Sequence, residues 1–258
     1  MNPQEEKFTG ETITSIHQWT PNLFSFRCTR FAGFRFTAGQ FARLGVRTSK
    51  GNIVWRAYSM VSSPFDEFLE FYSIVVPDGE FTSQLSQLQV GDEILIEKQA
   101  QGFLTLDRFV DGENLWMLAT GTGLAPFLSI LQDFEVWERF ATVVLVFSVR
   151  TEAELAYQEL LQELLSREYI KPHAHKFKFI PVVTREEVTG CLSQRITELI
   201  ENGELERKAG IQLSVEDSRV LICGNPQMVD DSRKLLKTRD MQLSLTRRPG
   251  QVAVENYW

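Results

Sequence analysis

The spacing of hydrophobic positions changes part-way along the chain. In about the first 108 residues, short apolar or alternating runs recur, and Gly, Pro, Asn and Asp separate them. Such runs are typical of strands, and many short strands in succession indicate a sandwich or barrel. One helix is predicted at residues 82–88, with Thr82 as its N-cap. The predicted strands lie within residues 12–19, 23–28, 40–46, 56–61, 69–76 and 92–98.

After about residue 112, continuous apolar runs alternate with amphipathic segments. This alternation of buried strands and helices indicates a doubly wound α/β domain with a parallel sheet. The fold class is therefore two-domain, with an antiparallel β-barrel at residues 1–110 and an α/β domain at residues 111–258. In the second domain we predict strands at 115–119, 142–149, 177–183, 219–223 and 251–257, and helices at 126–136, 152–165, 193–201 and 226–238.

Composition places the chain among ordinary globular proteins, because 43% of its 258 residues are hydrophobic and 24% are charged. No apolar run approaches the ~20 residues of a membrane helix, and the N-terminal end does not resemble a signal peptide. The three cysteines are too few and too scattered for a disulfide framework or an iron–sulfur cluster. We therefore expect a cytoplasmic protein. His173 and His175 lack an evident third ligand, so no metal site is predicted.

Charge is distributed unevenly along the chain. Residues 12–65 contain no Asp or Glu and seven Lys or Arg, so the remainder carries −14 within a chain whose net charge is −7. A basic face on an acidic protein predicts a specific anionic partner. We see no basic helix or aromatic RNA-binding pattern, so nucleic acid is not the expected partner. The alternative is that these are solvated charges at strand edges.

A Gly-rich turn, ATGTGLAPF (residues 119–127), follows a predicted strand and precedes a predicted helix. Gly121 and Gly123 permit a tight turn, and the free N–H groups of a helix start attract phosphate. Pro126 stands where the dinucleotide-binding fingerprint has a third Gly. A tight turn that binds no ligand is therefore the alternative.

Two further motifs fall where a ligand would bind. In RAYS (residues 56–59), Arg56 can fork onto a phosphate, Tyr58 offers a flat ring, and Ser59 can bond a nitrogen of a heterocycle. An ordinary strand with an edge Arg and a core Tyr is the alternative. In VLICGNPQM (residues 220–228), Cys223 ends a strand at the ligand-facing edge of the sheet. We interpret it as a wall of the site, because no His lies near it in sequence to act as a base.

Three arginines occupy the same predicted edge of the sheet. Arg150 and Arg185 follow neighbouring predicted strands, and Arg195 begins the next predicted helix. Cations in this position can bind the ribose 2′-phosphate that distinguishes NADP from NAD. Surface solubility is the alternative for each of them.

Five motifs then occur in a specific order: RAYS, FYSIVVPDGEFTSQL (71–85), LWMLATGTGLAPFLSIL (115–131), CGNPQM (223–228) and a terminal ENYW. In this combination the chain resembles the bacterial ferredoxin/flavodoxin–NADP reductases over nearly its whole length. The resemblance implies that the barrel binds FAD and that the α/β domain binds NADP(H).

The resemblance also implies individual contacts. Glu80 stands where a relative has a basic residue. The residues implied for FAD are Arg56, Ala57, Tyr58, Ser59, Tyr72, Ser73, Ile74, Val75, Glu80, Phe81, Thr82, Thr122, Tyr257 and Trp258. Those implied for NADP are Gly121, Thr122, Gly123, Arg150, Arg185, Arg195, Cys223, Gly224 and Asn225. Tyr257 and Trp258 are expected to cover the isoalloxazine and the adenine between them, with packing on the protein's own core as the alternative.

The implied reaction converts a two-electron donor into a one-electron donor. NADPH would deliver hydride to the flavin, which would pass single electrons to ferredoxin or flavodoxin, or the reverse. The catalytic residues implied are Ser59, Cys223, Glu255 and Tyr257, with Glu255 in a tuning role. A monomer whose residues 12–65 form the docking face for an acidic carrier is expected. Two alternatives remain open: a related reductase for free flavin, haem or quinone, and a non-catalytic nucleotide-binding regulator.

Overall fold

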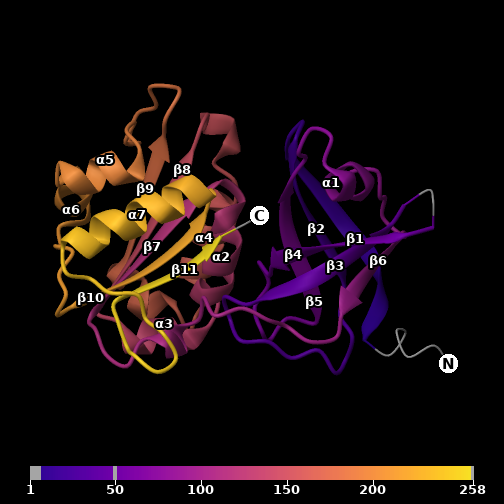
Figure 1. Ribbon diagram of the computed structural model, residues 1–258, viewed down its shortest axis with the longest axis horizontal. Helices are drawn as coiled ribbons and strands as arrows, with labels where there is room; N and C mark the ends of the chain where they lie inside the picture. Colours follow the sequence, from indigo (N-terminus) through magenta and orange to yellow (C-terminus); the bar gives the residue numbers. More distant parts are fainter. Residues whose placement is uncertain (1–6, 49–50, 257–258) are drawn as a thin grey trace.

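The computed structural model describes residues 7–48 and 51–256, which form two domains side by side (Figure 1). The first domain holds a six-stranded antiparallel sheet and the second a five-stranded parallel sheet, as the sequence predicts. The first sheet comprises β1 (Phe8–Thr20), β2 (Leu23–Thr29), β3 (Phe41–Arg47), β4 (Ile53–Ser59), β5 (Phe68–Ile74) and β6 (Glu93–Glu97). The second comprises β7 (Asn114–Thr120), β8 (Thr142–Val149), β9 (Phe177–Val183), β10 (Ser218–Gly224) and β11 (Val252–Asn256).

The antiparallel sheet, in the order β4-β3-β6-β1-β2-β5, curls until its two edge strands meet. Met60, just after β4, bridges to Phe71 on β5, and the Val61 amide donates to the Glu70 carbonyl at 2.8 Å. This contact gives the sheet the form of a barrel, which has fewer open strand edges than a flat sheet. Its interior is filled by buried apolar side chains, among them Phe24, Phe26, Phe34, Phe71 and Phe81.

The parallel sheet has the order β11-β10-β7-β8-β9, so the winding direction reverses between β7 and β10. Alternate residues of β7 face opposite layers: Met117 packs with the cluster of α2, α3 and α4, and Leu118 with that of α5, α6 and α7. Ligands of such sheets bind outside the carboxyl ends of the strands at the reversal point. The helices are α2 (Ala125–Leu131), α3 (Phe134–Arg139), α4 (Gln158–Ser166), α5 (Ile196–Glu201), α6 (Glu204–Ala209) and α7 (Pro226–Thr238).

Several predicted helix boundaries are wrong. The helix predicted at 126–136 is two helices: α2 ends at Leu131 with Gln132 as its C-cap, and Asp133 caps α3 by accepting from the Glu135 amide. The helix predicted from residue 152 begins only after Tyr157, whose φ of 63° is left-handed. Helix α5 likewise begins three residues later than predicted, at Ile196, and α6 was not predicted.

The N-cap predicted for the barrel helix is also wrong. Helix α1 (Glu80–Leu85) has Gly79 as its N-cap, and Thr82 lies inside the helix. The Thr82 hydroxyl accepts from the Val76 amide at 3.1 Å, so it orders the preceding turn. Among the helices of the described residues, none combines the length and apolarity that a bilayer span requires.

One stability prediction follows from the packing of α2. Phe127 is 0% exposed within the large cluster that joins the helices to the sheet, whereas Phe65 is 80% exposed on a barrel loop. We expect Phe127→Ala to lower the free energy of unfolding by about 3–5 kcal/mol, because removing a buried aromatic ring leaves a cavity. The matched Phe65→Ala should change it by less than about 0.5 kcal/mol. Urea unfolding followed by circular dichroism measures both, and similar losses in the two variants would contradict this packing.

Candidate active site

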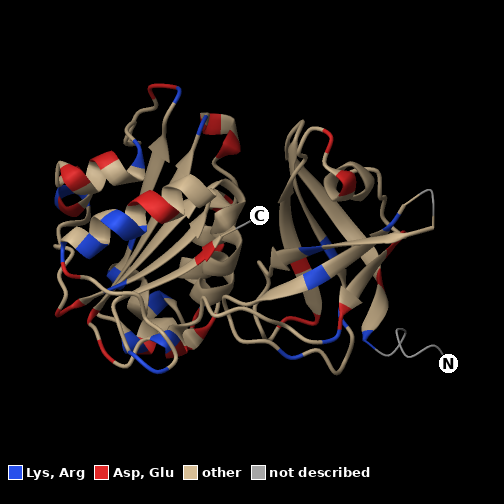
Figure 2. Cartoon of the chain, viewed as in Figure 1, with Lys and Arg blue, Asp and Glu red and all other residues tan. Residues whose placement is uncertain are grey.

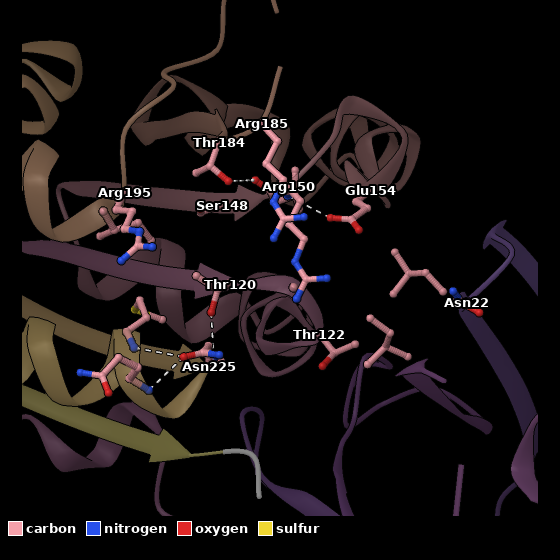
Figure 3. Close-up of a pocket in the computed structure, with 18 of the residues that line it drawn as sticks. Asn22, Thr120, Thr122, Ser148, Arg150, Glu154, Thr184, Arg185, Arg195 and Asn225 are labelled. Carbon is pink, nitrogen blue, oxygen red and sulfur yellow. Dashed lines mark hydrogen bonds between the residues drawn. The ribbon is translucent and has the colours of Figure 1, made fainter. Parts of the chain in front are cut away.

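A cleft of about 990 Å³ lies between the two domains, at the carboxyl ends of the parallel strands (Figure 3). The α/β wall comes from the ends of β7, β8, β9 and β10, including Thr120, Ser148, Thr184 and Gly224. The opposite wall comes from the barrel, through Thr20, Asn22, Leu23, Tyr72 and the segment 74–77. The cleft therefore occupies the position at which doubly wound sheets bind ligands.

The two glycines of the turn after β7 have different roles. Gly121 has φ +53°, and a Cβ there would meet no atom within 4 Å, so its backbone faces open space in the cleft. At Gly123 a Cβ would collide with the backbone carbonyl of Cys223. Gly121 therefore permits the turn, and Gly123 permits close packing of the turn against β10.

The end of β10 is joined to the end of β7. The Asn225 amide donates to the Thr120 hydroxyl at 2.8 Å, and a Cβ at Gly224 would collide with the same hydroxyl. The Asn225 side-chain oxygen accepts from the Gln227 and Met228 amides at 2.9 and 3.3 Å, so Asn225 caps α7. Cys223 is 0% exposed. It is not among the residues that line the cleft, and its burial argues against a role as an accessible nucleophile.

Arg150, Arg185 and Arg195 all line the cleft, and their guanidinium groups extend into it (Figure 3). The carboxylates of Glu154 and Glu198 accept from the backbone amides of Arg150 (2.9 Å) and Arg195 (3.4 Å). The Arg185 amide donates to the Arg150 carbonyl at 2.9 Å, which aligns the ends of β8 and β9. The three cations that the sequence singled out are thus brought to one place.

On the barrel side, Tyr58 and Tyr72 differ in the hydrogen bonding of their hydroxyl groups. The Tyr58 hydroxyl pairs with the Ser73 hydroxyl at 3.0 Å, and burial raises the Tyr58 pKa to about 12. Tyr72 lines the cleft, and within the described part of the chain its buried hydroxyl has no hydrogen-bond partner. A buried polar group without a partner is uncommon in native proteins. It therefore suits a bound ligand that supplies the missing hydrogen bond.

Ser59 and Glu255 meet across the domain interface. The Ser59 hydroxyl donates to the Glu255 carboxylate at 3.1 Å, although the two residues are 196 positions apart. Burial raises the Glu255 pKa to about 7, and the Ser59 hydrogen bond acts in the opposite direction. Glu255 on β11 lies directly opposite Cys223 on β10 in the parallel register. The interface thus gathers three of the implied catalytic residues.

Some predicted site residues do not reach the cleft. Ser73, Phe81 and Thr82 are buried in the barrel, and both Ser73 and Phe81 contact Tyr58. Arg56, Ala57 and Glu80 are exposed outside the cleft lining, and Arg56 donates to the Trp55 carbonyl at 2.8 Å. The predictions for Tyr257 and Trp258 lie outside the described residues.

Other lining residues were missed from the sequence. Thr120, Ser148 and Thr184 lie at or just after the ends of three parallel strands, where the rule that identified Arg150 and Arg185 would also have found them. Thr20 and Asn22 come from the β1–β2 turn. No sequence motif marks these two residues, because they reach the cleft only when the barrel docks on the α/β domain.

Known proteins share both halves of this arrangement. The family described as Oxidoreductase FAD-binding domain matches residues 13–102, and Oxidoreductase NAD-binding domain matches residues 117–234. The flavodoxin/ferredoxin–NADP reductases of Shigella flexneri and Escherichia coli (strain K12) are 46% and 45% identical, with 97% of this chain and 98% of each relative covered. A ferredoxin NADP⁺ reductase from Neisseria gonorrhoeae, solved with bound FAD and NADP, superposes with a TM-score of 0.90 at 42% identity, covering 98% of this chain and 99% of that one.

The fold, the cleft and the two matched domains define an oxidoreductase with an FAD-binding barrel and a pyridine-nucleotide-binding α/β domain. The chain belongs to the flavodoxin/ferredoxin–NADP reductase family. The residues present fit both cofactors. Tyr72, whose buried hydroxyl has no hydrogen-bond partner among the described residues, lines the cleft from the barrel, and three arginines and the open Gly121 turn line it from the sheet.

The raised pKa of Glu255 predicts a pH dependence of stability. An exposed Glu titrates near ~4.3, so between that value and about 7 the folded protein binds more protons than the unfolded chain. The stabilisation by the protonated carboxyl is complete below about pH 4.3 and is lost as pH rises through about 7. We therefore expect the FAD-free parent to lose stability relative to Glu255→Gln over this range and to level off above it.

Urea unfolding of both proteins across the pH range measures this difference. In Ser59→Ala the upper limit of this pH range should move to higher pH while the lower limit stays, because only the folded-state pKa of Glu255 loses the hydrogen bond that lowers it. A difference between parent and Glu255→Gln that stays constant with pH would contradict the prediction.

Proposed function

We propose that this protein exchanges electrons between NADPH and flavodoxin or ferredoxin through FAD. The observation that carries the proposal is a cleft that has the carboxyl edge of the parallel sheet as one wall and the barrel as the other. When bound, FAD accepts hydride from a reduced nicotinamide and releases electrons singly. The protein's own contribution is to hold the two nucleotides against each other and to exclude water.

For FAD, we propose binding by the barrel domain, residues 1–110. Arg56 is an exposed cation on β4 and suits a pyrophosphate, while Tyr58 and Tyr72 supply flat rings. Ser59 supplies a hydroxyl beside the domain interface. The segments 72–75 and 80–82 are proposed to support these groups, since Ser73 holds the Tyr58 hydroxyl and Phe81 packs on its ring. Thr122 and the terminal Tyr257 and Trp258 complete the proposed FAD contacts.

For NADP(H), we propose binding by residues 111–258. Arg150, Arg185 and Arg195 would hold the 2′-phosphate, since guanidinium groups match the geometry of phosphate oxygens. The turn 121–123 and residues 223–225 would cradle the remainder. Gly121 and Gly224 keep backbone close to the cleft, and the amide of Asn225 is fixed by Thr120.

We propose that Glu255 tunes the reaction from the domain interface. Its pKa of about 7 allows the carboxyl to hold or release a proton near neutral pH, and the hydroxyl of Ser59 donates to one of its two oxygens. Cys223, buried beside Glu255, would limit the space available to the nicotinamide.

We propose that the carrier docks at the loop 30–36, a smaller basic surface than the whole stretch 12–65 that the sequence suggests. Within the acid-free stretch, Arg30 and Arg35 donate to backbone carbonyls and leave positive charge on the loop 30–36. Figure 2 illustrates how sparse the charges are on the barrel compared with the α/β domain. Three other basic residues of the stretch pair with acidic residues of β5 and β6: Arg27–Glu70 (2.7 Å), Arg43–Glu97 (2.9 Å) and Arg47–Glu93 (3.8 Å). A monomer is the form we propose.

Cofactor preference tests the nucleotide assignment. We expect the parent to prefer NADPH to NADH, and Arg150→Ala or Arg185→Ala to raise the KM for NADPH by about 10- to 100-fold, because each change removes a charge-assisted hydrogen bond. The kinetics with NADH should change little. Steady-state rates with a neutral acceptor measure both, with Arg207→Ala on α6 as the control. Equal use of NADPH and NADH by the parent would refute the 2′-phosphate site.

Salt dependence tests the carrier. Arg35→Glu should lower kcat/KM for flavodoxin several-fold at low salt, and the difference should shrink as ionic strength rises, because exposed charges are screened over ~8 Å at 0.15 M. Reduction of a neutral dye by NADPH should not change. Arg207→Glu is the matched control, since it places the same charge reversal on α6, remote in sequence from the loop 30–36. A parent that reduces flavodoxin independently of salt, and no faster than free flavin, would favour a reductase for another acceptor.

A further inference from the structure

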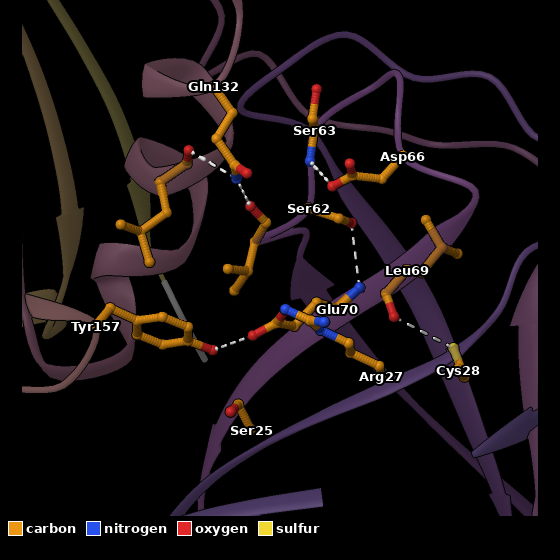
Figure 4. Close-up of polar contacts among 12 residues, drawn as sticks. Ser25, Arg27, Cys28, Ser62, Ser63, Asp66, Leu69, Glu70, Gln132 and Tyr157 are labelled. Atoms are coloured by element: carbon orange, nitrogen blue, oxygen red, sulfur yellow. Dashed lines mark hydrogen bonds and ion pairs between the residues drawn. The ribbon is translucent and has the colours of Figure 1, made fainter. Parts of the chain in front are cut away.

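A buried polar cluster joins the barrel to the α/β domain (Figure 4). The Tyr157 hydroxyl donates to one oxygen of the Glu70 carboxylate at 2.9 Å, and Arg27 donates to the other at 2.7 Å. Tyr157 precedes α4, whereas Glu70 and Arg27 lie on β5 and β2. Tyr157 and Glu70 are 4% and 7% exposed, so their hydrogen bond is shielded from water. The low dielectric of this buried position strengthens the hydrogen bond.

A second set of hydrogen bonds reaches the same part of the barrel from α2. The Ser129 hydroxyl donates to the Ser62 carbonyl at 2.8 Å, and the side-chain amide of Gln132 donates to the Val61 carbonyl at 2.7 Å. Within the barrel, the Glu70 amide donates to the Ser62 hydroxyl at 3.1 Å. Two parts of the α/β domain, Tyr157 and the helix α2, therefore bond to the same part of the barrel, residues 61–70. Helix α2 follows the Gly-rich turn of the cleft.

The backbone of Tyr157 is strained. Its φ of 63° is left-handed, a conformation that bulky residues rarely adopt unless their surroundings enforce it. Its ring packs against Trp19 and Tyr72 of the barrel, with centroids at 4.8 and 5.2 Å. The barrel therefore contacts the ring of a residue whose backbone is strained.

The cluster is also connected to both walls of the cleft. Tyr72, which packs on Tyr157, lines the barrel wall. Three residues before Tyr157, Glu154 accepts from the amide of Arg150, one of the cations of the opposite wall. A shift of Tyr157 relative to Glu70 would thus change the spacing between the two walls.

We infer that Tyr157 and Glu70 are positioning residues that set the separation of the pyridine nucleotide from the flavin. The inference rests on the proposed function, in which each domain holds one of the two nucleotides. Hydride transfer requires the reacting atoms to approach to about 3–3.5 Å, and a displacement of ~1 Å can cost ~100-fold in rate. Domains joined by a short linker move relative to each other unless their interface restrains them. The Tyr157–Glu70 bond is such a restraint.

The test uses Tyr157→Phe in the FAD-loaded protein, since this change keeps the ring and removes only the hydroxyl. We expect flavin reduction by NADPH in a single turnover to slow by roughly tenfold, with the apparent affinity for NADPH nearly unchanged. Reoxidation of the reduced protein by ferricyanide should keep its rate, because it does not depend on the distance between nucleotides. Ser129→Ala should slow the same step through the α2 contact.

Hydrogen exchange supplies a readout that does not depend on activity. Amides of residues 61–70 and 157–164 should exchange faster in Tyr157→Phe, whereas those of β6 should not. Ser218→Ala is the matched control, because it removes a hydroxyl that is 0% exposed and bonds to the Gln212 carbonyl within the α/β domain. It should leave both half-reactions and the exchange of residues 61–70 as in the parent.

The outcomes separate the two proposals. If Tyr157→Phe and Ser129→Ala reduce flavin at the parent rate, or slow both half-reactions equally, or behave as Ser218→Ala does, the positioning role is overturned. If the parent itself fails to reduce its flavin with NADPH, the proposed function is overturned and the inference falls with it.

Discussion

The contact between the barrel and the carboxyl edge of the parallel sheet is the interaction on which the site depends. Neither surface encloses a ligand alone, because the cleft has one wall from each domain. A buried apolar cluster continues across the contact and includes Leu23, Val61 and Tyr72 of the barrel together with residues of α2 and β7. Hydrophobic burial without direction would leave the domains free to slide, and the buried hydrogen bonds at Glu70 and at residues 61–62 restrict that freedom.

The chemistry of the interface follows from the same enclosure. Glu255 would titrate as an ordinary carboxyl on an exposed strand end, but burial at the domain interface raises its pKa to about 7, although the hydrogen bond from Ser59 acts in the opposite direction. On the other side of the cleft the reverse holds. Arg150, Arg185 and Arg195 are exposed at the edge of the cleft, where their guanidinium groups can meet an anionic ligand at low desolvation cost.

Elements defined by continuous apolar runs were predicted accurately. The strands at 142–149 and 177–183 and the helix at 226–238 coincide with β8, β9 and α7, because a fully buried strand or a strongly amphipathic helix leaves a local pattern. Helix starts were predicted less well. Asp133 divides one predicted helix into two, and the left-handed backbone at Tyr157 delays another, a conformation that depends on contacts with the barrel. Ser73, Phe81 and Thr82, which the motifs assign to the FAD site, lie in the barrel core outside the lining of the cleft.

By itself, the sequence determined the two-domain class, the order of the strands, and Arg150 and Arg185 at the strand ends of the ligand edge, because these depend on local periodicity and on residue type. It also carried the family resemblance through short motifs in order. Only the tertiary structure decided which residues face each other across the cleft, because pairs such as Ser59–Glu255 and Glu70–Tyr157 are separated by 196 and 87 positions. It also paired three arginines of the basic stretch 12–65 with acidic residues, since β5 and β6 bring Glu70, Glu93 and Glu97 beside them. Such long-range neighbours arise from sheet order and domain docking, and these leave no local pattern in the chain.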